Sequence, residues 1–172
     1  MDKRLFTLVV YAVLLSSTQA IDCDLPFEDI GGRCLFVDSL ISGSWYTMRH
    51  FCRRLGPFGG RLVKIDDADL LADIIRYIHY FGLNRCHYWI DASDEDGEGN
   101  WLQDDGTSVP MGPPFWGYDC ASFVHRPRSD PSLNCGILDH DRHYLMTDTS
   151  CQGDVGELPY SPICEAADIV VE

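Results

Sequence analysis

Cationic side chains gather in one late segment of an otherwise acidic chain. The 172 residues carry a formal net charge of −14, yet His125, Arg126, Arg128 and Arg142 lie close together in the sequence. Guanidinium groups bind sulfate, phosphate and carboxylate groups through paired N–H donors. We therefore expect these side chains to converge on one surface that binds an anionic ligand. The alternative is a solvated loop that carries scattered charges.

A second group of residues has the composition of a metal site. Asp139, His140, Asp141 and His143 are nearly consecutive. Imidazole and carboxylate groups are common ligands of zinc. The same spacing suits a turn that precedes a strand, and we favour the turn.

No catalytic arrangement emerges from the remaining polar residues. The chain contains 27 aspartates and glutamates, but no two are spaced in a way that indicates a glycosidase pair. No serine or cysteine nucleophile has a plausible partner, and cysteines committed to disulfides cannot attack a substrate. We therefore expect that the protein is not an enzyme.

The start of the chain has the pattern of a secretory signal peptide. Lys3 and Arg4 precede an apolar run over 5–15, and small residues follow at 18–20. That run is too short to span a bilayer. We expect a signal peptide over 1–20, one domain over 21–166, a short flexible tail over 167–172, and an extracellular location. The acidic charge argues against nucleic acid and anionic membranes as partners.

All eight cysteines follow the predicted signal peptide. An even number of cysteines in a secreted chain indicates a disulfide framework. Zinc binding by these cysteines is disfavoured, because the sequence has no Cys-x-x-Cys pair. Eight cysteines allow about 105 pairings, so their number alone leaves the connectivity open.

Hydrophobic spacing predicts helices early in the chain and short strands around and after them. One helix follows Ser44 and ends at Gly56, and a longer helix begins at Asp66 or Asp67 and ends at Gly82. Strands are predicted over 33–38, 62–65, 88–92, 135–138, 144–146 and 160–164. The segment 107–133 is rich in proline and has little periodicity, which predicts a long functional loop. These elements indicate an α+β domain.

Several motifs occur in an order that resembles one family. Trp89-Ile90-Asp91-Ala92 is similar to a Trp-Ile-Gly-Leu strand, and Glu98-Gly99-Asn100-Trp101 to a Glu-Gly-x-Trp turn. The tryptophan-rich stretch ending at Trp116 and the last three cysteines complete the pattern. The chain from Cys23 to Glu165 thus resembles the C-type lectin-like domain. The resemblance implies two helices that flank short antiparallel sheets, with a long irregular ligand-binding loop and disulfide bracing.

The resemblance also implies disulfide pairings. In the long form of the domain, an amino-terminal hairpin would be closed by Cys23–Cys34. Cys52 on the first helix would join Cys164 on the last strand, and Cys135 would join Cys151. Two cysteines are left over, and we pair them as Cys86–Cys120.

Lectins that this chain resembles hold calcium with oxygen ligands from a proline triplet in the long loop and from a later acidic triplet. Here Arg126-Pro127-Arg128 stands at the first position and Met146-Thr147-Asp148 at the second. Calcium needs six to eight oxygen ligands, and two cations beside one carboxylate repel it. We therefore expect no calcium at this primary site and no required cofactor. Asp94 and Glu98 match two acids of an accessory calcium site, whose remaining ligands are incomplete.

The expected function follows from the resemblance and this altered site. We expect a secreted recognition protein that binds carbohydrate or an anionic microbial surface ligand through the long loop, without the usual calcium. Such proteins commonly serve in defence, so the resemblance suggests innate immunity. The alternative is a module that binds a protein ligand and no sugar. The expected ligand-binding residues are Arg126, Arg128, Asp148, Trp116 and Arg142.

Overall fold

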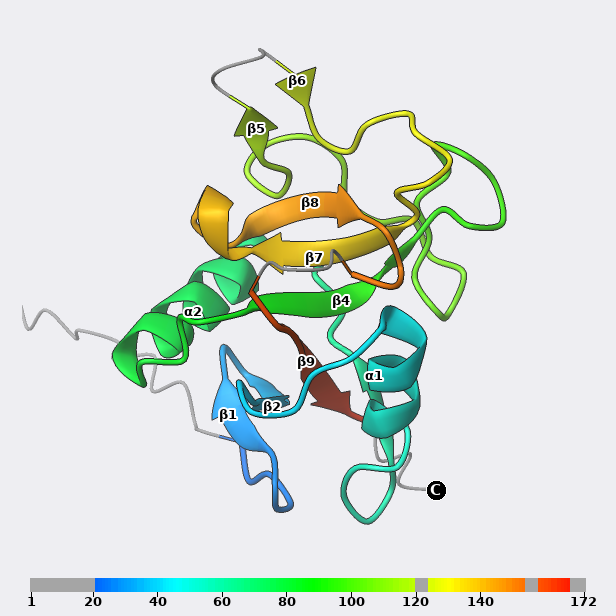
Figure 1. The fold of residues 1–172 in the computed structure, drawn as a ribbon. Helices are drawn as coiled ribbons and strands as arrows, with labels where there is room; N and C mark the ends of the chain where they lie inside the picture. The colour runs from blue at the N-terminus through cyan, green and yellow to red at the C-terminus, as the bar shows by residue number, and fades with distance from the viewer. Residues whose placement is uncertain (1–20, 120–123, 154–157, 168–172) are drawn as a thin grey trace, which may run out of the picture.

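The computed structural model describes residues 21–119, 124–153 and 158–167. The predicted signal peptide and residues 168–172 of the predicted tail lie outside these ranges, as does Cys120. Within them, the chain forms one sheet with a helix on either side of it and a long loop above it (Figure 1). No helix of these residues has the length and apolar character needed to cross a membrane.

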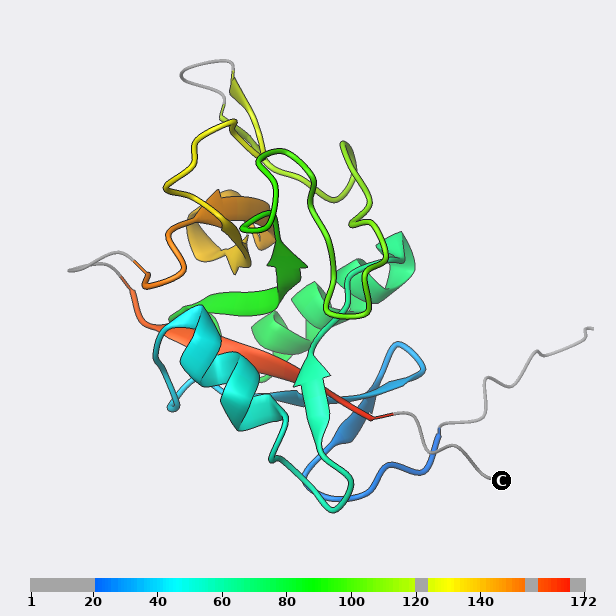
Figure 2. The same cartoon turned by 90° about the vertical axis from the view of Figure 1, so that its right-hand side faces the viewer.

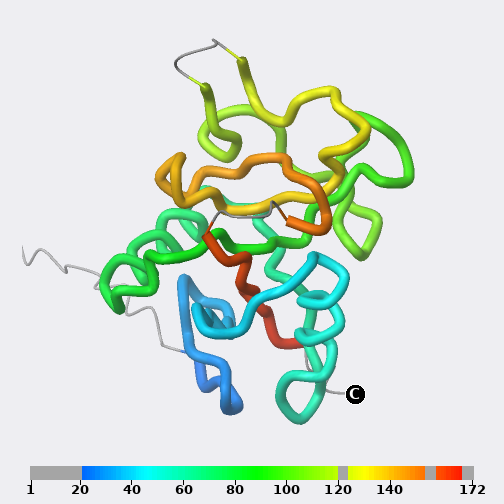
Figure 3. The backbone as a smooth tube through the Cα atoms, in the orientation of Figure 1, coloured from blue at the N-terminus to red at the C-terminus, as the bar shows by residue number. Residues whose placement is uncertain are grey.

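The lower part of the domain brings the two ends of the described chain together. Strands β1 (Glu28–Ile30) and β2 (Arg33–Val37) form an antiparallel hairpin, and β2 pairs with the last strand, β9 (Tyr160–Ala166). Strand β3 (Gly60–Leu62) also pairs with β9. Figure 3 shows this arrangement, with the early hairpin beside the late strand.

Helix α1 (Trp45–Cys52) begins where the sequence predicts and ends earlier. The Ser44 side chain accepts a hydrogen bond from the Thr47 amide at the N-terminus. After Cys52 the backbone tightens, because the amides of Arg54 and Leu55 bond three residues back. The predicted run to Gly56 is therefore a helix followed by a turn.

Helix α2 (Ala68–Tyr80) confirms the predicted longer helix. Asp67 caps its first turn, and Gly82 adopts a left-handed φ of 67° just after its end. The helix packs one apolar face against the sheet through Leu70, Leu71, Ile74 and Ile78.

Strand β4 (His87–Ser93) is the buried centre of the sheet. It pairs in parallel with β9 and antiparallel with β7 (Cys135–Asp139), which pairs in turn with β8 (Leu145–Thr149). The sheet order is β1-β2-β9-β4-β7-β8. Strands β7 and β4 approach closely at Gly136, where a Cβ atom would lie 2.7 Å from the Cβ of Ala92.

A short 3-10 helix, η1 (His140–Arg142), connects β7 to β8. The turn that the sequence predicts at Asp139–His143 is therefore confirmed. His143 and Tyr144 both have positive φ, at 55° and 60°, so strand β8 begins one residue later than predicted.

The long loop carries a small hairpin of its own. Strands β5 (Tyr118–Asp119) and β6 (Val124–His125) pair antiparallel at the top of the domain. Figure 2 shows the loop segments above and beside β7 and β8. Hydrophobic periodicity did not predict this hairpin or β1, because strands of two or three residues leave no periodic signal. The amino-terminal hairpin that the resemblance implied is present as β1 and β2.

Three of the four predicted disulfides are present: Cys23–Cys34, Cys52–Cys164 and Cys135–Cys151. The predicted Cys86–Cys120 bond is wrong as far as Cys86 is concerned, because Cys86 is a buried free thiol. Its sulfur lies in the apolar core and donates to the Leu83 carbonyl at 3.8 Å. A count of leftover cysteines does not detect that one of them is a core residue.

Candidate ligand groove beneath the long loop

A groove of about 730 Å³ lies where the β5–β6 hairpin, strand β8 and the η1 turn meet. We call it the arginine groove. Its lining includes Arg126, Arg128, Arg142, Asp148, Tyr118 and Tyr160. Four of the five predicted ligand-binding residues therefore share one surface, although Asp148 is 22 residues from Arg126 in sequence.

Asp148 is held by both arginines of the Arg126-Pro127-Arg128 triplet. Its Oδ1 lies 3.1 Å from Arg126 Nη1, and its Oδ2 lies 3.0 Å from Arg128 Nε. The Asp148 side chain is 0% exposed, and that of Arg126 is 7% exposed. Two guanidinium groups thus neutralise a carboxylate that is fully removed from water.

This arrangement decides whether the groove fits a calcium ion at Asp148. Calcium takes six to eight oxygen ligands. Both oxygens of Asp148 already accept hydrogen bonds from cations, and the triplet contributes guanidinium groups instead of oxygens. The residues at Asp148 therefore do not fit a calcium ion.

Arg142 is paired with carboxylates at the other end of the groove. It contacts Asp139 through Nη1 and lies 3.8 Å from Asp119 through Nη2. Burial of Asp139 opposes its ionisation, but hydrogen bonds from His87, Arg142 and the Asp141 amide lower its pKa to about 2. Asp139 is therefore ionised at neutral pH.

The balance of charges in the groove does not favour an anion. Each of the three guanidinium groups faces a carboxylate, and the lining carries four aspartates. Such alternating donors and acceptors match the hydroxyl groups of a neutral sugar better than a sulfate or phosphate. The fourth cationic residue of the predicted surface, His125, is exposed and packs its ring 4.8 Å from Tyr118.

Two tyrosines supply apolar surface to the groove. Tyr118 on β5 is 38% exposed. Tyr160 on β9 stacks on Trp89 at 4.9 Å and on His87 at 4.8 Å. Aromatic faces beside paired polar groups are typical of small-ligand sites.

The prediction that Trp116 contacts the ligand is wrong. Its side chain is 4% exposed and belongs to the main core cluster. Its indole N–H donates to the Pro110 carbonyl at 2.8 Å, and its ring packs edge-on against Trp101 at 5.0 Å. Trp116 therefore anchors the long loop to the core, which is the ordinary role of a large aromatic residue in a small domain.

The accessory calcium candidates form only part of a cage. Asp94 Oδ1 and Asn134 Oδ1 are buried and accept no hydrogen bond among the described residues. Burial and the charges of Glu98 and Asp148 raise the pKa of Asp94, against a hydrogen bond from the Gly99 amide. Glu98 is exposed, and within the described ranges no third acidic ligand atom gathers with Asp94 and Glu98. These residues therefore do not form a complete calcium site.

His87, Tyr118 and Tyr160 are among the groove residues that sequence reasoning missed. His87 opens strand β4 and Tyr160 opens strand β9, and the two strands pair in parallel with these residues in register. The hydrophobic pattern identified both strands but contains no information about which ends meet. A parallel pairing between them is the only signal that would have placed both side chains in the groove.

Comparison with known proteins identifies the fold. No protein-family model and no curated protein sequence matches the chain. Solved structures do match. TC14, a C-type lectin from the tunicate Polyandrocarpa misakiensis, is 21% identical with a TM-score of 0.59, covering 78% of this chain and 97% of that one.

Two further structures extend this likeness. The carbohydrate-recognition domain of mouse scavenger receptor C-type lectin is 19% identical with a TM-score of 0.63, covering 84% and 98% of the two chains. A calcium-independent type II antifreeze protein is 18% identical with a TM-score of 0.62, covering 87% and 98%. At these identities the likeness shows the fold alone. The chain has the C-type lectin-like fold, as its motifs predicted.

Proposed function

We propose that this C-type lectin-like protein is secreted and binds carbohydrate on microbial or other surfaces through the arginine groove, without calcium at Asp148. The observation that supports this proposal is the pairing of Arg126 and Arg128 with one buried aspartate at the floor of the groove. The guanidinium groups take the place of a metal ion as counter-charges and leave the groove polar and closed to calcium.

Arg128 is the residue best placed to bind the ligand. Its side chain is 40% exposed, and only its Nε contacts Asp148. Its two terminal nitrogens, Nη1 and Nη2, form no ion pair with the described residues. A fork of N–H donors held in place by a buried carboxylate can bind two neighbouring hydroxyl groups of a sugar, and the ring of Tyr118 offers a face for the apolar side of that sugar.

The solved structures support a binding role over a catalytic one. Two of them are described as a C-type lectin and as a carbohydrate-recognition domain. The antifreeze protein is described as calcium-independent, so this fold occurs in a protein that functions without the ion. The second candidate function is binding of a protein ligand. The polar residues that line the groove also permit this kind of contact.

A glycan array tests the proposal. The purified protein should bind at least one class of glycan equally well in calcium and in EDTA. Arg128→Gln should weaken that binding by about tenfold or more, because it removes the donors that face the ligand. Arg76→Gln is the matched control, since Arg76 is an exposed arginine on helix α2 that pairs only locally with Asp73.

Two results would contradict the proposal. Loss of glycan binding in EDTA that added calcium restores and added zinc does not would show that calcium bridges the ligand. Absence of binding to every glycan, together with a protein that binds wild type but not Arg128→Gln, would support the second candidate function.

A further inference from the structure

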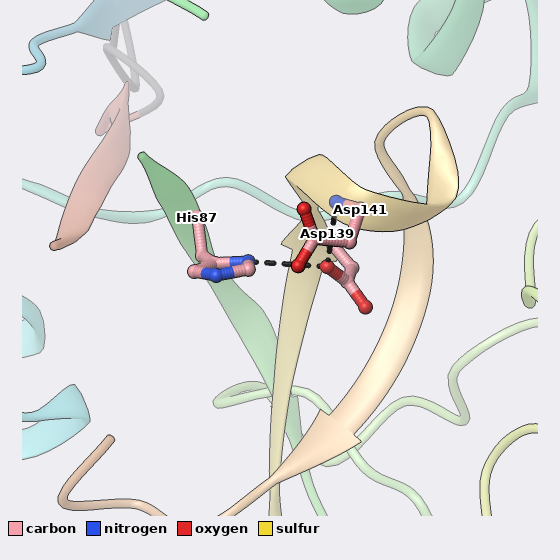
Figure 4. A group of neighbouring side chains, drawn as sticks. All are labelled: His87, Asp139 and Asp141. Carbon is pink, nitrogen blue, oxygen red and sulfur yellow. Dashed lines mark hydrogen bonds and ion pairs between the residues drawn. The ribbon is translucent and has the colours of Figure 1, made fainter. Parts of the chain in front are cut away.

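The end of the arginine groove beside the η1 turn contains three potential metal ligands from two strands and a turn. His87 is the first residue of β4, Asp139 is the last residue of β7, and Asp141 lies in the η1 turn. Figure 4 shows the three side chains pointing toward one another. The neighbouring residues Tyr88 and Leu138 pair across β4 and β7, so the sheet register brings His87 and Asp139 together.

The geometry of these three groups is close to that of a metal site. Their candidate ligand atoms all lie within 4.8 Å of one another. His87 Nδ1 and Asp139 Oδ1 are 3.1 Å apart. A tetrahedral zinc ion holds N and O ligands at about 2.0–2.2 Å, so its ligand atoms are roughly 3.3–3.6 Å apart. If His87 Nδ1 and Asp139 Oδ1 moved slightly apart and the exposed Asp141 side chain rotated, all three residues could contact one zinc ion.

Neighbouring residues orient the two buried ligands, His87 and Asp139, whereas among the described residues the Asp141 side chain pairs only with the adjacent His140. Arg142 contacts Asp139 Oδ2, while Asp139 Oδ1 accepts a hydrogen bond from the Asp141 amide at 3.0 Å and faces His87 Nδ1. His140 Nδ1 lies 2.8 Å from Asp141 Oδ1. The His87 ring stacks on Tyr160 and is 3% exposed. Hydrogen-bonded and packed partners of this kind orient metal ligands and strengthen metal binding.

We propose that His87, Asp139 and Asp141 bind a zinc ion at the end of the arginine groove beside the η1 turn. One imidazole and two carboxylates select a borderline transition metal over calcium, which prefers oxygen ligands alone. Three protein ligands leave a coordination position open, and all three residues line the groove. The open position therefore faces the space in which a ligand would lie. This site does not depend on sugar binding by the groove.

Zinc titration of tag-free protein tests the site. After dialysis against EDTA and then metal-free buffer, calorimetry with zinc chloride should give one ion per chain. Asp141→Asn and His87→Gln should each weaken zinc binding by at least the 10–100-fold that loss of an outer partner typically causes. Zinc should also raise the melting temperature of wild type but not of Asp141→Asn.

Two control variants make the result specific. His50→Gln removes an exposed histidine from helix α1 and should bind zinc as wild type does. Arg128→Gln should also keep its zinc affinity, so that a failure of sugar binding and a failure of zinc binding can be told apart. Asp141 is exposed, so its replacement tests the site even if the buried His87 cannot be changed without unfolding. Absence of zinc binding in wild type, or equal binding by Asp141→Asn, would overturn the proposal.

Discussion

Each half of the domain contains a buried carboxylate that is held by two arginines. In the lower half, which we call the base (β1, β2, α1, β3 and β9), Glu165 lies 3.4 Å from Arg33 and 3.3 Å from Arg61. In the upper half, which we call the loop half (residues 94–151), Asp148 lies 3.1 Å from Arg126 and 3.0 Å from Arg128. Figure 1 shows the two halves on either side of β4.

The two clusters differ in how many further partners they have. In the base, Arg33 also binds Asp66 at 3.1 Å and the Lys64 carbonyl at 2.6 Å, and Glu165 accepts a hydrogen bond from the Lys64 amide. In the loop half, the two guanidinium groups bind no carboxylate other than Asp148 among the described residues. The base cluster is therefore a branched network, whereas Asp148 alone anchors its arginines.

The largest expected difference between the halves comes from their disulfides. Cys52–Cys164 closes a segment of 112 residues in the base, and Cys135–Cys151 closes 16 residues in the loop half. Chain-entropy estimates give about 4–5 kcal/mol for the long closure and about 3 kcal/mol for the short one. Guanidinium unfolding of the two paired Cys→Ser variants should show the larger loss for Cys52/Cys164. The reverse order would show that the loop half limits stability.

Asp148→Asn should destabilise the protein by about 3–5 kcal/mol, because it leaves the buried Arg126 without a counter-charge. Glu165→Gln is the matched change in the base. It should cost less, since Arg33 keeps Asp66 and the Lys64 carbonyl as partners. Urea unfolding at neutral pH measures the stability of both variants. Equal losses of stability would contradict the distinction between the branched network at Glu165 and the single carboxylate Asp148.

Asp91 on β4, between the halves, should make stability depend on pH. Burial raises its pKa to about 7, against the charges of Arg49 and Arg61, whereas the unfolded carboxyl titrates near pH 4. Between these values the folded state binds more protons, so the free energy of unfolding falls as pH rises. Asp91→Asn cannot lose a proton. It should match wild type near pH 4 and be more stable by about 2–4 kcal/mol at pH 8.

Asp105→Asn is the control with the opposite sign. A hydrogen bond from Lys64 lowers the pKa of this exposed carboxyl, so ionisation favours the folded state and its removal should destabilise the protein above pH 4. Thermal unfolding from pH 4 to pH 8 compares both variants with wild type. An Asp91→Asn advantage that is constant across this range would contradict the assigned titration.

The smallest expected stability change is that of Arg128→Gln. Arg128 is the exposed partner of the pair, at 40%, and Arg126 still neutralises the buried Asp148, so the loss should be about 1 kcal/mol. The same variant should lose glycan binding, so stability and binding should separate at this residue. A loss of stability comparable to that of Asp148→Asn would show that Arg128 belongs to the scaffold.

Local patterns in the sequence predicted both helices and the strands β2 and β9. Ser44 and Asp67 are caps, and the apolar face of α2 is periodic, so both helices begin where predicted. Three disulfides followed from the resemblance, because their cysteines stand at the motif positions. In the loop half, the motif register placed Arg126, Arg128 and Asp148 correctly beside one another.

Long-range packing explains what the sequence did not predict. The burial of Trp116 depends on Trp101 and on the path of a loop without periodicity. Cys86 is free because it is buried in the core just before β4, and the sequence pattern does not show on which side of the sheet it lies. His87 joins Asp139 and Asp141 only through the β4–β7 register, about fifty residues away in sequence.

Strand β9 has a consequence for the order of events during synthesis. It pairs with β2, β3 and β4 and carries Cys164, the partner of Cys52. Until the ribosome has delivered residues 160–166, those earlier strands have open edges and the Cys52 thiol has no native partner. Open edges are sites of aggregation, and contacts between distant residues form slowly. The nascent chain therefore exposes these strand edges until β9 arrives.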